Sequence, residues 1–195
     1  MGAPHLSEQA MFRRRLLRNP RQISAIAPSS RHLGDAMAEG FGAESGDLVE
    51  FGPGTGSISR ALLRAGVPPH RLTLFELDGE LVDFLRATLP PGVTVHNAPA
   101  QAAPDLMQGR QVDGVVSGLP LLSLPGAVRT DVMRAAFDML APGAPMVQFT
   151  YGARAPVPTD TIAALGLLVE RGRRVLFNLP PARIYRFRLR RFGGL

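Results

Sequence analysis

Hydrophobic residues in this chain gather in short apolar runs that alternate with stretches of helical spacing. Apolar runs of strand length occupy residues 48–51, 72–77, 93–96, 112–117 and 146–151. Helical spacing begins at Ser57 and also covers residues 33–41, 79–89, 128–140 and 160–168. Buried strands that alternate with helices predict an α/β domain with a doubly wound, mostly parallel sheet.

The C-terminal tail has a different pattern, because apolar residues and arginines alternate strictly within it. The apolar side chains fall on one face and the arginines on the other: Tyr185, Phe187 and Leu189 against Arg186, Arg188 and Arg190. We expect a half-exposed edge strand that pairs antiparallel with residues 173–179. An arginine row on such an edge also prevents pairing with strands of other molecules.

Three glycines at alternate positions follow the first apolar run, in the segment L-V-E-F-G-P-G-T-G-S of residues 48–57. A strand, a glycine turn and a helix N-terminus in this order place backbone N–H groups around a bound ligand. Residues without side chains also let the backbone approach that ligand closely. The glycines are Gly52, Gly54 and Gly56, and the carboxylate of Glu50 before them can hold a cationic or hydroxylated group.

Two nucleotide-binding motifs compete for this segment. The dinucleotide fingerprint G-x-G-x-x-G fails, because its last position falls on Ser57 or Ser59. The pattern E-x-G-x-G-x-G stands instead, and it resembles motif I of class I S-adenosylmethionine-dependent methyltransferases. A glycine turn that binds no ligand is the alternative.

A second carboxylate supports the ligand site. Glu76 ends the second predicted strand, 22 residues beyond Gly54. A carboxylate about 20 residues past the glycine turn is where such folds hold a pair of ribose hydroxyls. Leu77 lies beside it, and Asp78 takes the role if the register is shifted. An ordinary strand-end charge is the alternative for Glu76.

The third predicted strand is followed by Asn97-Ala98. Class I methyltransferases often have Asp-Ala here, with the acid near the adenine amine. Asn97 retains the capacity to hydrogen-bond but adds no charge.

Composition excludes several classes of site. The 195 residues suit one domain, and they contain no Cys, so disulfides and thiolate metal sites are excluded. The four His residues are scattered along the chain, which argues against a zinc site. No apolar run approaches the roughly 20 residues of a membrane span, and no signal-peptide core is present. We expect a cytoplasmic protein.

Charge is distributed unevenly along the chain. All 22 basic residues are Arg, and the net charge of +6 is the balance of two basic ends and an acidic middle. Residues 1–31 hold six Arg and one acid, and residues 170–195 hold eight Arg and one acid. Basic ends predict an anionic partner, either a membrane surface or a nucleic acid.

An amphipathic helix is predicted over residues 6–18 and ends at Asn19-Pro20. Its apolar face includes Leu6, Ala10, Phe12, Leu16 and Leu17, and Arg14, Arg15 and Arg18 lie opposite. This pattern is typical of interfacial membrane binding, and packing on its own domain is the alternative. We therefore divide the chain into a membrane-binding helix, residues 1–20, and a methyltransferase domain, residues 21–195.

Hydroxyl groups precede the helical pattern that begins near residue 33, in the segment I-A-P-S-S-R. Ser29 or Ser30 can cap this helix. Equally, the two hydroxyls and Arg31 can meet a carboxylate or phosphate of a ligand.

The fourth predicted strand ends in S-G-L-P-L, residues 117–121. N-methyltransferases that act on nucleobases or amides typically carry N/D-P-P-Y or N-L-P-Y here, so that an aromatic ring stacks on the planar acceptor. This chain lacks that aromatic residue, and the N-L-P-P of residues 178–181 lies between the last two strands instead. The apolar stretch G-L-P-L-L-S-L-P favours an aliphatic or lipid substrate.

Five segments together resemble the bacterial phospholipid N-methyltransferases of the soluble PmtA type. They are I-A-P-S-S-R, V-E-F-G-P-G-T-G, S-G-L-P-L-L-S-L-P, F-T-Y-G and F-N-L-P-P-A-R-I-Y-R, within residues 12–190. The resemblance implies a Rossmann-like, mostly parallel seven-stranded sheet with an antiparallel C-terminal strand and an added N-terminal amphipathic helix. It also implies methylation of phosphatidylethanolamine by S-adenosylmethionine to its mono-, di- and trimethylated forms. The enzyme would bind the anionic inner face of the cell membrane, without metal or nucleic acid.

Roles for the donor-binding residues follow as a hypothesis. Glu50 and the glycine turn would place the methionine end of S-adenosylmethionine, Glu76 its ribose and Asn97, beside Ala98, its adenine. The Ser117 hydroxyl and the Gly118 carbonyl would face the transferable methyl group.

Two tyrosines and several arginines are candidates for contacts with the acceptor. Tyr151 could accept a hydrogen bond from the amine or cover a quaternary ammonium through a cation–π contact. Tyr185 is a second candidate, and core packing is the alternative for both. An arginine could bind the lipid phosphate bidentately. The candidates, among which the sequence does not choose, are Arg31, Arg154, Arg183 and Arg186.

Two other functions compete with lipid methylation. An rRNA adenine N6-dimethyltransferase would also suit basic ends, although the N-L-P-Y motif is missing. A non-catalytic membrane-surface module that binds a nucleotide or lipid is the other.

Overall fold

A seven-stranded sheet forms the centre of the computed structural model, which describes residues 31–151, 155–178 and 180–190. The strands are β1 (Leu48–Phe51), β2 (Leu72–Glu76), β3 (Thr94–Asn97), β4 (Gly114–Ser117), β5 (Met146–Thr150), β6 (Leu167–Val175) and β7 (Ala182–Leu189). Their order is β3-β2-β1-β4-β5-β7-β6, with β7 antiparallel to both neighbours and the other pairs parallel. The predicted fold class is confirmed.

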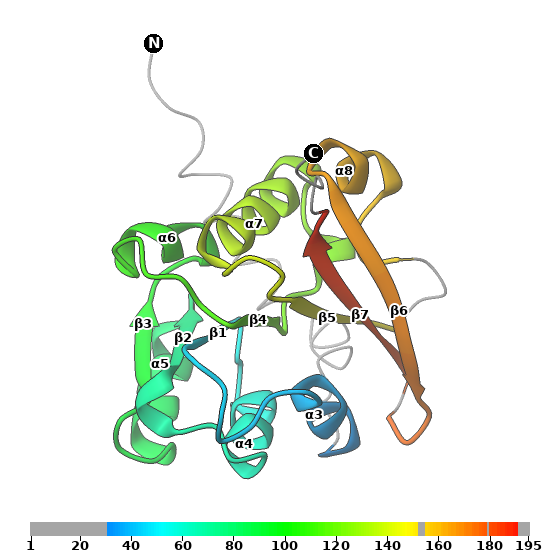
Figure 1. The fold of residues 1–195 in the computed structure, drawn as a ribbon. Coiled ribbons are helices and arrows are strands. Elements are labelled where there is room, and N and C mark those ends of the chain that lie inside the picture. The colour runs from blue at the N-terminus through cyan, green and yellow to red at the C-terminus, as the bar shows by residue number, and fades with distance from the viewer. Residues whose placement is uncertain (1–30, 152–154, 179, 191–195) are drawn as a thin grey trace.

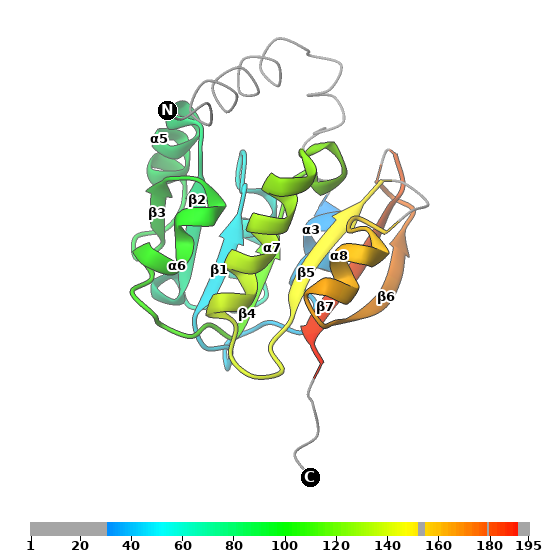
Figure 2. The same cartoon turned by 90° about the horizontal axis from the view of Figure 1, so that it is seen from above.

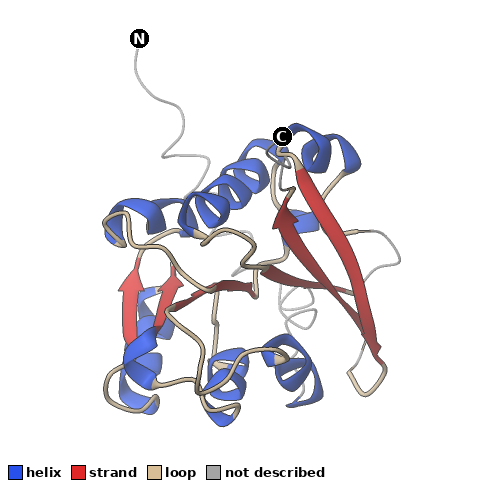
Figure 3. Ribbon diagram, viewed as in Figure 1, coloured by secondary structure: helices blue, strands red, loops and turns tan. Residues whose placement is uncertain are grey.

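Helices cover both faces of the sheet (Figures 1 and 3). The first three lie on one face: α3 (Arg31–Ala38), α4 (Ser57–Arg64) and α5 (Gly79–Thr88). The other three lie on the opposite face: α6 (Ala103–Leu106), α7 (Gly126–Met139) and α8 (Thr159–Ala164). Short 3₁₀ turns span Pro69–Arg71 (η2), Ala100–Ala102 (η3) and Leu121–Ser123 (η4).

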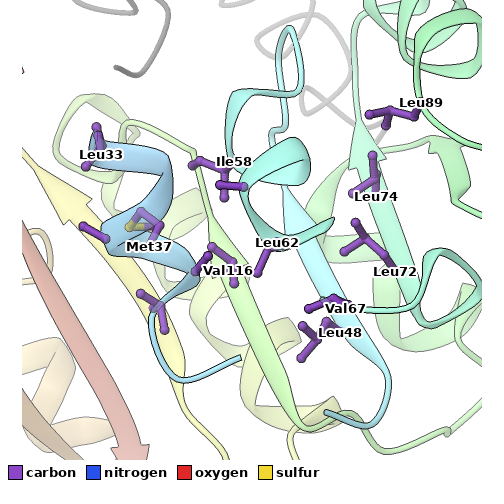
Figure 4. Packing of buried hydrophobic residues seen from close by; sticks show 14 of the residues in the cluster. Leu33, Met37, Leu48, Ile58, Leu62, Val67, Leu72, Leu74, Leu89 and Val116 are labelled. Carbon is purple, nitrogen blue, oxygen red and sulfur yellow. The ribbon is translucent and has the colours of Figure 1, made fainter. Parts of the chain in front are cut away.

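Two apolar clusters hold these layers together, one on each face of the sheet. Leu33 and Met37 of α3 and Leu62 of α4 pack on Leu48 and Val116 of the sheet, as Figure 4 shows. The second cluster joins α6 and α7 to the other face of β1, β4, β5 and β7. Every residue of β1, β2 and β4 is buried, as expected for the central strands of a parallel sheet.

Helix boundaries follow local chemistry. Asp78 caps α5, since its side chain accepts hydrogen bonds from the N–H groups of Glu80 and Leu81. The helix ends at Thr88, before Leu89 and Pro90, because the residue preceding a proline avoids helical geometry. Gly56, in the left-handed conformation, precedes α4 without a side-chain cap.

Several predicted boundaries are corrected by the structure. The helix predicted over residues 160–168 ends at Ala164, and Leu167 already belongs to β6. The strand predicted over residues 173–179 is therefore longer at its start and ends at Val175, although its antiparallel pairing with β7 is as expected. β7 is not an edge strand, because β6 covers it, so the arginine row of β7 does not guard a sheet edge.

The N-terminal amphipathic helix predicted over residues 6–18 lies outside the described residues, as does the division at residue 20. Within the described ranges, no helix combines the length and apolar character needed to cross a membrane.

Candidate active site

The glycine turn lies at the carboxyl end of β1, where parallel α/β sheets bind their ligands. Gly52, Gly54 and Gly56 all have positive φ, at 65°, 57° and 81°, a conformation that glycine adopts without strain. A β-carbon placed on Gly54 would meet no atom within 4 Å, so the outer side of the turn is open. One placed on Gly52 would lie 2.5 Å from Cδ2 of Leu119. The turn therefore offers its backbone to a ligand on one side and packs tightly on the other.

The S-G-L segment after β4 interlocks with this turn. The Gly118 amide donates a hydrogen bond to the Phe51 carbonyl over 2.8 Å. A β-carbon on Gly118 would lie 2.5 Å from the Gly52 carbonyl oxygen. The close approach of the ends of β1 and β4 thus requires glycine at positions 52 and 118. Sequence alone does not reveal this constraint.

Glu76 connects the end of β2 to the glycine turn. Its Oε2 accepts a hydrogen bond from the Gly54 amide over 3.0 Å. Its Oε1 accepts from the amides of Leu77 and Asp78, at 2.7 and 3.0 Å. Three of the roughly four lone-pair sites of the carboxylate are therefore in use, which leaves Oε2 able to accept one more hydrogen bond.

The residues around Glu76 have mostly structural roles. Asp78 is occupied as the cap of α5, so the fallback role given to it by a shifted register is not needed. The side-chain amide of Asn97 donates to the carbonyls of Glu76 and Leu77, both at 3.1 Å, and the Ala98 amide also donates to Glu76. Asn97 therefore braces the end of β2 through its side-chain nitrogen, and its side-chain oxygen takes no part in these bonds.

Glu50 is fully buried on the α3–α4 face of β1. Its Oε2 accepts a hydrogen bond from the Ser59 hydroxyl of α4 over 2.6 Å, and its Oε1 has no hydrogen-bond partner among the described residues. Burial raises the pKa of Glu50 from 4.5 to about 8, and the Glu76 carboxylate adds to the rise while Ser59 and Arg60 oppose it. The site thus holds a neutral acid that a cation would ionise.

A row of residues in register crosses the sheet at the level of the site, from Phe51 through Ser117 and Gln148 to Tyr185. Ser117 is buried, and its hydroxyl accepts a hydrogen bond from the Leu119 amide at 3.3 Å. Gln148 is also buried and donates to the Leu119 carbonyl at 2.9 Å, while its Oε1 has no partner in the described chain. Ser117 and Gln148 therefore shape the loop after β4.

The two tyrosines have different surroundings. Tyr151 follows β5, is half-buried, and packs edge-on against Phe149 with ring centroids 5.1 Å apart. Burial raises the pKa of the Tyr151 hydroxyl, and a hydrogen bond with Asn178 only partly offsets this. Tyr185 is buried in the second apolar cluster and stacks with Phe187, so it has the packing role that was the alternative reading.

The candidate phosphate-binding arginines are dispersed. Arg186 donates to the Glu39 carbonyl at 2.7 Å and so fixes the end of α3, which gives it a structural role. Arg183 donates to the Gly172 carbonyl at 3.4 Å, and the exposed Arg31 lies 3.9 Å from Asp35. The remaining candidates lie outside the described residues: Arg154, Ser29, Ser30, Phe12, Arg14, Arg15, Leu16 and Arg18.

Sequence reasoning missed three polar residues of the site, Ser59, Gln148 and Asn178. Ser59 and Gln148 carried a usable signal, because each is a polar residue at a position where its helix or strand is otherwise apolar. Asn178 was set aside because N-L-P-P lies between the last two strands. That placement is correct, but the β6–β7 connection brings Asn178 to Tyr151. Among the described residues, no group of three or more His, Cys, Asp or Glu is placed to hold a metal ion.

The sheet order and the glycine turn define the class I S-adenosylmethionine-dependent methyltransferase fold. Solved structures of such enzymes align with the chain: NodS, an N-methyltransferase from Bradyrhizobium japonicum WM9, has 18% identity and a TM-score of 0.62, covering 82% of this chain and 94% of NodS. MtfA, a glycopeptide N-methyltransferase complexed with S-adenosylmethionine, has 15% identity and a TM-score of 0.64, covering 85% of this chain and 96% of MtfA.

Two relatives by sequence differ in substrate. The ornithine lipid N-methyltransferase of Singulisphaera acidiphila is 28% identical over 146 residues, which is 72% of this chain and 76% of that protein. The ribosomal RNA small subunit methyltransferase A of Synechococcus sp. is 37% identical over 76 residues, 37% of this chain and 27% of that protein. No family model matches the sequence.

Proposed function

We propose that this protein is an S-adenosylmethionine-dependent N-methyltransferase that acts on the primary amine of a membrane lipid. The observation that carries the donor part is the hydrogen bond between the Gly54 amide and the Glu76 carboxylate, beside an open glycine turn. The lipid part is supported by the apolar loop after β4 and by the similarity to an ornithine lipid N-methyltransferase.

The donor, when bound, supplies an electrophilic methyl group on its sulfonium. Glu76 would accept a hydrogen bond from a ribose hydroxyl through Oε2, and the Asn97 side-chain oxygen would accept one from the adenine amine. Glu50, whose Oε1 has no partner in the part of the chain that the structure describes, would ionise next to the cationic methionine end. The Gly118 carbonyl and the loop that Ser117 supports would border the reacting groups.

The acceptor amine must be neutral, because an ammonium has no lone pair to attack with. A dry pocket beside a positive charge lowers the pKa of an amine, so the proton can leave to water before transfer. The raised pKa of Tyr151 keeps its hydroxyl neutral at physiological pH, so it would orient the amine by accepting a hydrogen bond and would not act as a phenolate base.

Two lipids carry a suitable amine. Phosphatidylethanolamine follows from the resemblance to phospholipid N-methyltransferases, with stepwise formation of its methylated derivatives. An ornithine lipid follows from the Singulisphaera relative. Arg31, Arg154 or Arg183 would bind the anionic part of the headgroup. The basic helix predicted over residues 6–18 would hold the enzyme on the inner face of the cell membrane.

An rRNA substrate is the second candidate, favoured by the partial match to a ribosomal RNA methyltransferase and by the basic ends of the chain.

The test is to incubate the protein and radiolabelled S-adenosylmethionine with three acceptors in parallel. These are anionic vesicles containing phosphatidylethanolamine, the same vesicles containing an ornithine lipid, and ribosomal RNA. We expect label in a lipid, and deletion of residues 1–18 should weaken vesicle binding more than donor binding. Label confined to RNA would overturn the proposal.

A further inference from the structure

The turn between β6 and β7 exposes two large apolar side chains. Phe177 is 80% exposed and Leu176 is 64% exposed, more than any other large hydrophobic residue of the described chain. The aromatic contact of Phe177 within the described ranges is with His32 of α3, at 5.4 Å between ring centroids. Isolated exposed leucines are common in proteins, but an adjacent Leu-Phe pair at the tip of a hairpin indicates a surface that another apolar phase covers.

Arginines flank this pair along the chain. Arg173 and Arg174 precede it on β6, and Arg183 follows it on β7. Arg174 is exposed and makes no ion pair with the described residues, whereas Arg173 lies 3.2 Å from Glu39. The other acid nearby, Asp35, is itself paired with Arg64 at 2.7 Å. The hairpin turn therefore combines two exposed apolar side chains with a net positive charge on the adjoining strand ends.

The turn lies at the same edge of the sheet as the candidate active site. Thr150, at the end of β5, pairs with Arg183, near the start of β7. The β6–β7 turn, which immediately precedes β7, therefore lies beyond the carboxyl ends of the parallel strands. Figure 2 shows the end of β5 and the β6–β7 turn on the same side of the molecule. Leu122, in the loop after β4 at this edge, is also exposed. A flat anionic surface that contacts the tip would face the site.

We infer that the β6–β7 turn is a membrane-insertion element, in which Leu176 and Phe177 enter the interface of an anionic bilayer while Arg174 and its neighbours contact lipid phosphates. Apolar side chains flanked by arginines are the composition that binds such interfaces. This inference rests on the proposed function, since insertion here would present the lipid amine to the site. It is separate from the predicted N-terminal helix and locates a second contact with the membrane.

The chain contains no Trp, so a single introduced tryptophan reports on one position. Phe177→Trp is the probe, in the full-length protein, with vesicles of phosphatidylglycerol and phosphatidylethanolamine. We expect its emission to shift to the blue and to be quenched by lipids brominated in their acyl chains. Phe84→Trp is the matched control, because Phe84 on α5 is also exposed and also lies beside an arginine, Arg60. Its emission should not change.

A loss-of-function arm uses Leu176→Ser/Phe177→Ser. Both positions are exposed, so the variant should melt like the wild type and bind vesicles about tenfold more weakly. Methylation of lipid in vesicles should fall, while methylation of the same lipid dispersed in detergent should not. Insertion of Phe177→Trp without any lipid methylation would overturn the proposed function alone. Unchanged emission of Phe177→Trp in the presence of vesicles, whether or not the protein sediments with them, would overturn the inference.

Discussion

The Gly54 amide donates a hydrogen bond to Oε2 of Glu76 over 3.0 Å, which ties the glycine turn after β1 to the end of β2. The remaining oxygen of Glu76 accepts two further backbone N–H groups, so one carboxylate orders both halves of the proposed donor site. Charge-assisted hydrogen bonds of this kind contribute more than neutral ones. This relationship explains why the spacing of 22 residues between the two positions carries information.

Glu76→Gln should weaken binding of S-adenosylmethionine by about 10- to 100-fold, because an amide supplies one acceptor oxygen where the carboxylate supplies two. Isothermal titration calorimetry measures this directly. Glu80→Gln, at an exposed position four residues later in the chain, should bind the donor like the wild type. Equal affinities for Glu76→Gln and the wild type would remove Glu76 from the donor site.

Glu50→Gln should change how stability depends on pH. The folded protein keeps Glu50 protonated up to a pKa of about 8, whereas the unfolded chain releases that proton near pH 4.5. The contribution of this group is therefore complete below pH 4.5 and is lost as pH rises toward 8, by up to about 1.4 kcal/mol per pH unit. Glu50→Gln should show a flatter curve of unfolding free energy in this window. Denaturant titrations at several pH values test this, with exposed Glu44→Gln as control, and parallel curves for Glu50→Gln and wild type would contradict it.

Gly118→Ala should destabilise the fold by about 1–3 kcal/mol, because the added methyl group would press on the Gly52 carbonyl oxygen and force the two turns apart. Donor affinity should fall with it. Gly126→Ala is the control, since a β-carbon there meets only the flexible end of Arg129, at 3.9 Å. Urea unfolding of both variants gives the comparison, and similar stabilities would show that the ends of β1 and β4 are not tightly packed.

Tyr151→Phe should lower the rate of methyl transfer about five- to tenfold, because it removes the hydroxyl that would orient the amine and keeps the ring that packs on Phe149. Tyr185→Phe provides the control within the same chain. Tyr185 is buried in the core, so this variant should transfer methyl groups at the normal rate. Steady-state assays with a lipid acceptor measure both rates. Near-normal turnover by Tyr151→Phe would exclude hydroxyl chemistry at that position.

The order of apolar runs and helical segments was enough to predict the fold class, and the glycine turn with Glu76 was enough to propose a framework for the donor site. Strand β1 and the glycine turn are visible in the sequence because buried strands are apolar and the turn needs positive φ. Glu76 could be predicted because it ends the next parallel strand, whose end lies beside that of β1. The apolar loop after β4 was likewise evident from composition.

Contacts between residues far apart in the sequence establish which polar groups meet and where the last strands begin. Glu50 pairs with Ser59 across a strand–helix contact, and Tyr151 meets Asn178 because an antiparallel hairpin returns to the end of β5. The sequence places the start of β6 at residue 173 instead of Leu167, because V-E-R-G-R-R has no alternation of apolar and polar residues. Pairing with β7 imposes the strand there, and long-range hydrogen bonding leaves no periodic trace in the sequence of an exposed edge.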